Sequence, residues 1–211
     1  LVWTREDDVQ GGYYRPMHFH RVEVGIGPDG LPMAWRHVIV GQSLLMGTPF
    51  ESFGLKNGVD STVTEGTANT HYNIPNLHVT AHHPKVNVPV LWWRSVGHTH
   101  NAFVMETLID ELATRANLSP FAYRRKLLKP EAKKVLSALD LLEKASTSWR
   151  SRLPGGHALG VSCHESFDTG VACAVDVSIE NKRPKIHRAT VAVNCGLAVN
   201  PLTIESQFLA G

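Results

Sequence analysis

The fold is decided by the stretch Asn101-Ala102-Phe103-Val104-Met105-Glu106-Thr107-Leu108-Ile109-Asp110-Glu111-Leu112-Ala113. Its apolar side chains recur at positions 104, 105, 108, 109 and 112, which is the spacing of one face of an α-helix. Thr99 or Asn101 can cap the start of this helix, and Asn117 suits its end. We therefore expect an amphipathic helix in the middle of the chain.

Two further helices are expected directly after this one. Ser119 is a suitable N-cap and Pro120 a suitable first helical residue. Another helix is expected to begin at Pro130-Glu131, with its apolar face formed by Val135, Leu136, Leu139 and Leu142. Together the three helices form one helical block.

Outside this block the hydrophobic period changes to two, which is typical of β-strands. A hairpin is expected over residues 17–41, turning at Gly27-Pro28-Asp29-Gly30, where proline presets φ and glycine supplies a positive φ. Three more strands are expected after the helices, followed by a helix that opens at Pro201. These strands cover residues 158–164, 170–179 and 185–193.

Three segments carry weaker patterns. Leu1-Val2-Trp3-Thr4 is expected to be a strand, and Val86–Trp92 a short apolar strand interrupted by Pro89. Residues 43–70 are rich in Gly, Ser, Thr and Asn and are expected to be irregular. An irregular segment of that length is usually functional or packed against another domain.

The order of the elements predicts a mixed α/β (α+β) fold in two lobes. Arg150–Gly156, a polar linker with glycine and proline, separates them. The first lobe covers residues 1–150, with the hairpin and the helical block, and the second begins at residue 157 and runs to 211. Both ends of the chain fall inside elements expected to be regular, so we expect a piece of a longer polypeptide, because domain boundaries normally lie in exposed linkers.

Composition excludes several classes of protein. The chain has 211 residues, with 21 Lys+Arg against 19 Asp+Glu, so its net charge of +2 gives no electrostatic case for nucleic acid. No apolar run approaches the length of about 18 residues that spans a membrane. The three cysteines make neither a disulfide framework nor a complete all-cysteine iron–sulfur site, and are expected to be small buried strand residues.

Arg94 is the most informative single side chain. It stands between an apolar segment and the start of a helix, where backbone N–H groups suit an anion and a guanidinium is a forked donor. The alternative is an ordinary surface arginine.

Other titratable clusters have both a chemical and a structural interpretation. Neighbouring histidines can bind zinc or copper, a His–Glu pair can do acid–base work, and an acidic triplet can hold a metal or a substrate. The alternatives are exposed loop or helix-cap histidines, a structural strand end and a solvated turn. The clusters are His82-His83, His98-Thr99-His100, His164-Glu165 and Glu6-Asp7-Asp8.

The segment around Arg94 resembles a known family. Trp93-Arg94-Ser95-Val96-Gly97-His98-Thr99-His100-Asn101-Ala102-Phe103, with Glu106 and Ile109-Asp110-Glu111-Leu112-Ala113 after it, resembles the molybdenum-binding large subunit of the xanthine oxidase and aldehyde oxidase family. The branch it most resembles is the isoquinoline 1-oxidoreductase β-subunit with its aldehyde dehydrogenase relatives. Weaker matches span the chain in the family's order. They are Val2–Asp8, Tyr13–Pro16, Tyr72–Asn76, His164–Phe167, Gly170–Ala172 and Cys195–Pro201, leading to Gln207.

The resemblance implies a cofactor and a reaction. The cofactor is a molybdenum–molybdopterin of the cytosine dinucleotide type, and the reaction oxidises an aldehyde or an N-heterocycle with oxygen taken from water. Electrons then leave through [2Fe–2S] clusters on a separate small subunit. The aldehyde oxidase type of molybdenum cofactor-binding domain is the implied fold, and members of this branch allow either a periplasmic or a cytoplasmic location in a bacterium.

Carried over by position, the resemblance assigns few site residues. Arg94, Gly97 and Gln207 match positions that contact the cofactor, and Val96 replaces the aromatic residue that stacks on the substrate in purine-oxidising members. The general-base glutamate would follow residue 211, and no side chain here is expected to ligate a metal. A Gly-Gly-Phe-Gly cofactor loop would precede residue 1.

Three functions remain open at this point. The chain is either a piece of a molybdenum hydroxylase that is inactive in isolation, or a stand-alone scaffold or binding protein with the same fold and no cofactor, or a histidine-rich metal-binding protein. By resemblance the first accounts for more of the sequence than the other two, and it also predicts exposed apolar surface where further parts would pack.

Overall fold

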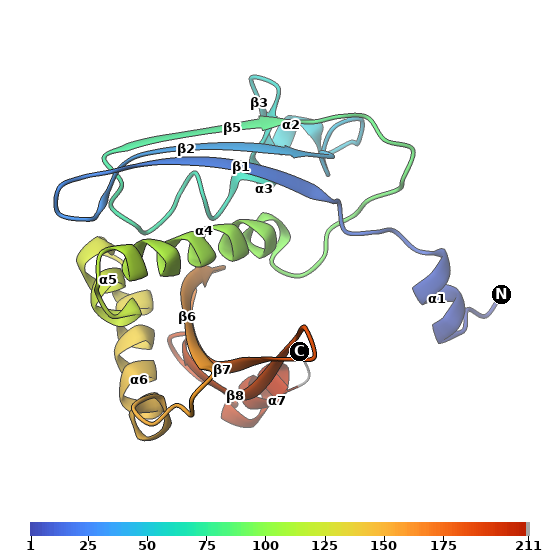
Figure 1. The fold of residues 1–211 in the computed structure, drawn as a ribbon. Helices are drawn as coiled ribbons and strands as arrows, with labels where there is room; N and C mark the ends of the chain where they lie inside the picture. The colour runs from blue at the N-terminus through green and yellow to red at the C-terminus, as the bar shows by residue number, and fades with distance from the viewer. Residues whose placement is uncertain (210–211) are drawn as a thin grey trace.

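The computed structural model describes residues 1–209, arranged as two three-stranded sheets with a long helix between them (Figure 1). The helices are α1 (Arg5–Gly11), α2 (Glu51–Gly54), α3 (Ser61–Thr64), α4 (Val96–Arg115), α5 (Pro120–Leu127), α6 (Lys133–Arg150) and α7 (Pro201–Leu209). The strands are β1 (His18–Ile26), β2 (Pro32–Gly41), β3 (Leu55–Lys56), β4 (Val59–Asp60), β5 (Asn76–His82), β6 (His157–Ser166), β7 (Thr169–Glu180) and β8 (Arg183–Asn194). The mixed α/β fold is confirmed.

The first sheet has the order β1-β2-β5. The predicted hairpin is confirmed: β1 and β2 pair antiparallel, and Gly30 takes a φ of 78° in the turn between them. β5 lies parallel to β2 and was not predicted. The strand predicted over residues 86–92 is wrong, because Pro89 interrupts the segment and only Val90 within it makes a β-bridge, to Tyr14.

Helix α4 lies beneath this sheet and carries the predicted apolar face. Met105, Ile109 and Leu112 are buried there, as the spacing required. The helix begins earlier than predicted, at Val96, and neither Thr99 nor Asn101 is its N-cap. The N-cap is Ser95, which has a left-handed conformation and caps nothing with its side chain.

The next two helices follow their sequence signals closely. Ser119 caps α5, its hydroxyl accepting from Ala122 N at 3.1 Å, with Pro120 in the first turn. The last helix of the block starts at Lys133, three residues after Pro130, and its predicted face is the buried one. That face covers the second sheet, where the backbone of Gly170 approaches Lys134 so closely that a Cβ would lie 2.6 Å from its carbonyl carbon.

The second sheet has the order β6-β7-β8, with both pairs antiparallel, and confirms the three predicted strands. The predicted helix after them is α7, where the side chain of Asn200 accepts from the first-turn amides of Leu202 and Thr203. Cys163 and Cys173 are strand residues as expected, the first buried and the second half-buried. Cys195 lies beyond the end of β8.

A single core joins the residues on both sides of the 150–156 linker. It packs Trp35 of β2 and Ile109 of α4 in one cluster with Leu139 of α6 and with Val161 and Ala172 of the second sheet. The division into lobes at this linker therefore stays a prediction about chain organisation, while the packing is continuous across it.

The N-terminal segment differs from its prediction. Residues 1–4 are not a strand, and Thr4 instead caps α1 in a reciprocal capping box with Asp7. Residues 43–70, predicted to be irregular, contain α2, β3, β4 and α3, all of four residues or fewer. Within residues 1–209 no helix has both the length and the apolarity needed to cross a membrane.

Candidate functional site

The loop before α4 is a tight turn with strained backbone. Val96 N donates to Trp93 O at 3.0 Å, and the two residues before Gly97 both have positive φ: 67° at Ser95 and 43° at Val96. A positive φ is unusual for serine and a clear outlier for a β-branched valine, because the Cβ crowds the backbone. The turn brings Arg94 to the outside of the loop.

Arg94 contacts the C-terminal helix across a sequence separation of 113 residues. Its Nη1 donates to Oε1 of Gln207 at 2.7 Å. Two of the residues assigned by resemblance therefore lie together, both on the exposed side of the chain. The contact leaves the other N–H groups of the guanidinium and the amide nitrogen of Gln207 free to donate.

The N-terminus of α4, which the sequence offered as one possible place for an anion, already binds a carboxylate of this chain. Glu65 Oε1 accepts from Gly97 N at 2.8 Å, so a carboxylate from another segment caps the helix. Burial raises the pKa of Glu65, and the hydrogen bond from Gly97 opposes that rise. Glu65 was not singled out from the sequence, because nothing local links it to a helix 32 residues away.

Gly97 is fixed by close packing. A Cβ on Gly97 would lie 2.1 Å from the carbonyl oxygen of Thr62. Its N–H is engaged by Glu65, so its assignment to the cofactor stays a prediction. Val96 is half-buried and lines a narrow cavity with Arg15, Trp93 and His100, and its assignment to a substrate pocket also stays a prediction.

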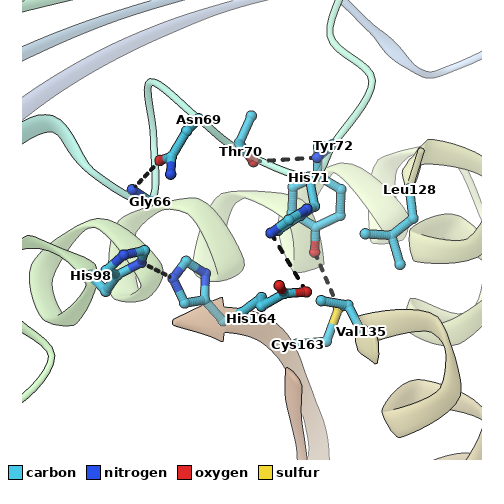
Figure 2. Close-up of a pocket in the computed structure, with 11 residues that line it drawn as sticks. Gly66, Asn69, Thr70, His71, Tyr72, His98, Leu128, Val135, Cys163 and His164 are labelled. Atoms are coloured by element: carbon cyan, nitrogen blue, oxygen red, sulfur yellow. Dashed lines mark hydrogen bonds and ion pairs between the residues drawn. The ribbon is translucent and has the colours of Figure 1, made fainter. Parts of the chain in front are cut away.

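A second polar pocket, lined by residues that include His71, His98 and His164, is shown in Figure 2. His98 Nδ1 and His164 Nε2 are 2.8 Å apart, and His71 Nε2 lies 3.7 Å from Glu165 Oε2. His164 and Glu165, which the sequence offered as either an acid–base pair or a structural strand end, thus contact different histidines. Burial, with His98 next to it, lowers the pKa of His164 to about 4, and burial also lowers the pKa of His98, so both imidazoles are neutral at pH 7.

Four histidines and a tryptophan form a further cluster between the first sheet and α4. Trp35 Nε1 can only donate, to His37 Nδ1 at 3.5 Å, so neutral His37 carries its proton on Nε2. His37 Nε2 then donates to His20 Nδ1 at 2.7 Å, and His20 Nε2 to His100 Nδ1 at 3.0 Å. His18 stacks on His100 with ring centroids 3.7 Å apart. Of these four, only His100 was singled out from the sequence, with metal binding and an exposed helix cap both open, and it is half-buried in this cluster.

The remaining sequence candidates carry no site. Glu6, Asp7 and Asp8 form the exposed first turn of α1, where acidic side chains favour a helix N-terminus. In the part of the chain that the structure describes, no three His, Cys, Asp or Glu side chains are placed to hold one metal ion. His83 binds the backbone, with Asp60 N donating to its Nε2 and Gly41 O accepting from its Nδ1.

The fold and the Arg94 loop define a class of protein. The molybdopterin cofactor-binding domain family matches residues 1–128, which is more than half of the chain, and the chain belongs to this family. It is a domain of the molybdenum hydroxylase type, within the xanthine oxidase family that the Arg94 segment resembles.

Three relatives support this assignment. The chain is 25% identical over 217 aligned residues to isoquinoline 1-oxidoreductase subunit beta from Brevundimonas diminuta. The alignment covers 100% of this chain and 27% of that protein. Quinoline 2-oxidoreductase from Pseudomonas putida 86 has the same fold, with a TM-score of 0.60, 22% identity and coverage of 82% of this chain and 24% of that one. Aldehyde oxidoreductase from Desulfovibrio gigas matches with a TM-score of 0.59, 18% identity and coverage of 88% and 22%. The chain thus spans about a quarter of the length of these relatives.

Proposed function

We propose that this chain forms one wall of the molybdenum–pterin site of a hydroxylase that oxidises an aldehyde or an N-heterocycle with oxygen from water. The observation that carries the proposal is the hydrogen bond between Arg94 and Gln207, which joins the loop before α4 to helix α7 at an exposed edge of the domain. The side chain of Gln207 has no other hydrogen bond in the described part of the chain, so its amide nitrogen is free for a ligand.

The residues at this edge fit such a cofactor as a partial wall. A pterin with its phosphates and metal-bound oxygen atoms needs many donors, and a guanidinium is a strong, permanently charged one. Arg94 offers donors beyond the one used by Gln207. The side chains here do not surround a group of that size, so other segments must supply the remaining walls.

The chemistry divides between the cofactor and the chain. When bound, the molybdenum group supplies the two-electron oxidation and the transfer of a hydroxyl derived from water. Arg94 would hold negatively charged oxygen in place, and Gln207 would fix the orientation of the guanidinium while donating from its own amide. Gly97 and Val96 would lie behind Arg94, with Val96 leaving room for a substrate that does not stack on an aromatic ring.

The proposal includes a partner. The Brevundimonas relative is itself a subunit, and electrons from the reaction would pass to a small subunit with [2Fe–2S] clusters. The isolated chain is expected to retain no molybdenum and to reduce no dye in the presence of aldehydes.

The test is molybdenum content in the complete large subunit that carries this sequence, measured by mass spectrometry of the metal. Arg94→Met should weaken cofactor retention roughly tenfold, because hydrogen bonds from charged groups contribute about that much. Arg152→Met, at an exposed arginine of the linker, is the matched control and should leave retention unchanged.

Two results would overturn the proposal. Equal molybdenum content in wild type and Arg94→Met would remove Arg94 from the site. Absence of molybdenum from the complete wild-type subunit would favour the alternative, a scaffold that has this fold and no cofactor.

A further inference from the structure

An arginine far from Arg94 in sequence holds the strained turn from beneath. Arg15 belongs to an extended segment that is itself fixed by two backbone hydrogen bonds, from Tyr14 N to Pro89 O at 2.9 Å and from Leu91 N to Tyr14 O at 3.1 Å. These bonds tie the segment to the chain that leads into the Arg94 loop. These backbone bonds alone therefore place Arg15 next to the turn, independently of the contacts of its side chain.

The guanidinium of Arg15 then binds the backbone on both sides of the two strained residues. Nη2 donates to the carbonyl of Arg94 at 3.2 Å, and Nη1 donates to Thr99 Oγ1 at 3.0 Å and to the carbonyl of Val96 at 3.5 Å. Its carbon Cζ lies 5.7 Å from the centre of the Trp93 ring, within the range of a cation–π contact. Every one of these partners lies between residues 93 and 99.

These contacts oppose a specific cost. A left-handed conformation at a serine and then at a valine is unfavourable, and such strain persists only where the surroundings over-determine it. Thr99 Oγ1 also donates to the carbonyl of Arg94 at 3.2 Å, and Glu65 holds Gly97 N. Among the described residues, only the side chain of Arg15 donates to the carbonyls of both residue 94 and residue 96, through the two terminal nitrogens of its planar guanidinium.

We propose that Arg15 is a positioning residue: by binding the carbonyls of Arg94 and Val96, it keeps the turn in its left-handed form and the Arg94 guanidinium directed at Gln207. This inference deepens the proposed function and rests on it only for the role of Arg94. The geometry of the turn can be tested separately from cofactor binding.

The first experiment measures the local order of the turn in this chain. Hydrogen exchange of the amides of residues 95–97, and the rate at which trypsin cleaves after Arg94, are followed by mass spectrometry in wild type, Arg15→Lys and Arg15→Met. Both variants should exchange and be cleaved about tenfold faster at this turn, because the fork is lost in each. Arg21→Met, at an arginine of β1 with a side chain 69% exposed, is the control and should change neither rate.

Global unfolding is separated from local release by the melting temperature and by exchange in the α6 helix. Faster exchange confined to residues 95–97, with α6 still protected, supports the proposal. Unchanged rates at the turn in Arg15→Met would overturn it, and so would full protection in Arg15→Lys, because a single ammonium would then suffice. If Arg15→Met unfolds the chain, Arg15→Lys provides the decisive measurement.

The second experiment uses the complete large subunit and a double variant. If Arg15 acts through Arg94, the Arg15→Met/Arg94→Met double variant should retain as much molybdenum as Arg94→Met alone, whereas independent roles would give multiplied losses. If the turn exchanges faster in Arg15→Met but Arg94→Met retains its molybdenum, the positioning role of Arg15 stands and the proposed function is rejected. If Arg94→Met loses molybdenum but the turn is unaffected in Arg15→Met, the proposed function stands and the positioning role of Arg15 is rejected.

Discussion

At Gly97 the backbone of α4 passes so close to Thr62 that only glycine fits. Gly97→Ala would place a Cβ 2.1 Å from a carbonyl oxygen, and because that oxygen belongs to backbone it cannot swing away. We expect the variant to lose about 1–3 kcal/mol of unfolding free energy, the usual cost of overpacking, measured by urea denaturation.

The matched control for Gly97 is Gly155, which has no neighbour within 4 Å of an added Cβ. Gly155→Ala should change the unfolding free energy by less than about 0.5 kcal/mol. Equal stabilities for the two variants would show that α4 can shift away from Thr62, and that Gly97 is not fixed by packing.

At the scale of single residues, the sequence identified the ends of the Arg94–Gln207 contact but not its support. Arg94 and Gln207 were selected by resemblance, residue by residue. Arg15 and Glu65 were not, because their contacts with the loop span 79 and 32 positions and leave no local pattern. The cluster around His100 was not predicted for the same reason: His18, His20 and His37 lie far from it in sequence, and only the packing of the hairpin on α4 brings them together.

At the scale of elements, one buried ion pair joins α4, α5 and β6. Arg124 is fully buried and donates from Nε to Glu106 at 3.0 Å, from Nη1 to Asp110 at 2.5 Å and to the carbonyl of Val161. Arg124→Met should cost about 3–5 kcal/mol of unfolding free energy, because it leaves the buried carboxylate of Glu106 without its positively charged partner. Thermal and urea denaturation would measure this loss.

The next residue provides the control for that experiment. Arg125 also binds two carboxylates, Asp140 at 2.7 Å and Glu143 at 2.5 Å, but on the surface. Arg125→Met should cost less than about 1 kcal/mol, since exposed ion pairs contribute little. Similar losses in the two variants would mean that burial does not set the energy of these pairs.

The histidine cluster between β1, β2 and α4 predicts a pH dependence of stability. Burial, with the neighbouring histidines, lowers the pKa of His18 and His37 to about 4 and of His100 to about 2, from 6.5. The folded state therefore binds fewer protons than the unfolded state below pH 6.5. The free energy of unfolding should be highest above pH 6.5 and should fall as the pH drops. The fall should reach up to about 1.4 kcal/mol per pH unit for each histidine, and less where solvent reaches the ring.

Urea denaturation between pH 7.5 and pH 4.5 tests this expectation. His37→Gln should flatten the dependence, because one of the groups that must stay neutral is gone. His82→Gln, at an exposed position of β5, should leave the slope as it is in wild type. Arg15 and His83 also face His18, so both must be intact in these measurements. A slope that is the same in all three proteins would contradict the expectation.

The elements themselves were predicted where the hydrophobic period was strong. The hairpin, the three central helices and the last three strands follow their patterns, with starts shifted by a few residues. β5 was missed, although Leu77, Val79 and Ala81 alternate along it with polar residues. Residues 1–4 were taken for a strand and α1 was not predicted, although Thr4 and Asp7 have the spacing of a capping box.

At the scale of the whole molecule, large apolar side chains lie exposed on several elements. They include Trp3, Phe19, Phe53, Leu197 and Leu209, each more than 60% exposed. Apolar surface of this extent favours association. Light scattering after size exclusion should show a mass that rises with concentration for the isolated chain, and Phe19→Lys with Phe53→Lys should reduce that rise. A monomer at every concentration would contradict this expectation.

The core that continues past the 150–156 linker bears on how the protein can be divided. A cut in that linker would leave the last three strands without the helix face on which Val161 and Ala172 pack. It would also expose Leu139 and Leu142 to solvent. Neither half would hold together by itself, yet each carries the complement of the other. Coexpressed as separate peptides, the two halves would form a split pair whose reassembly could serve as a reporter of proximity between proteins fused to them.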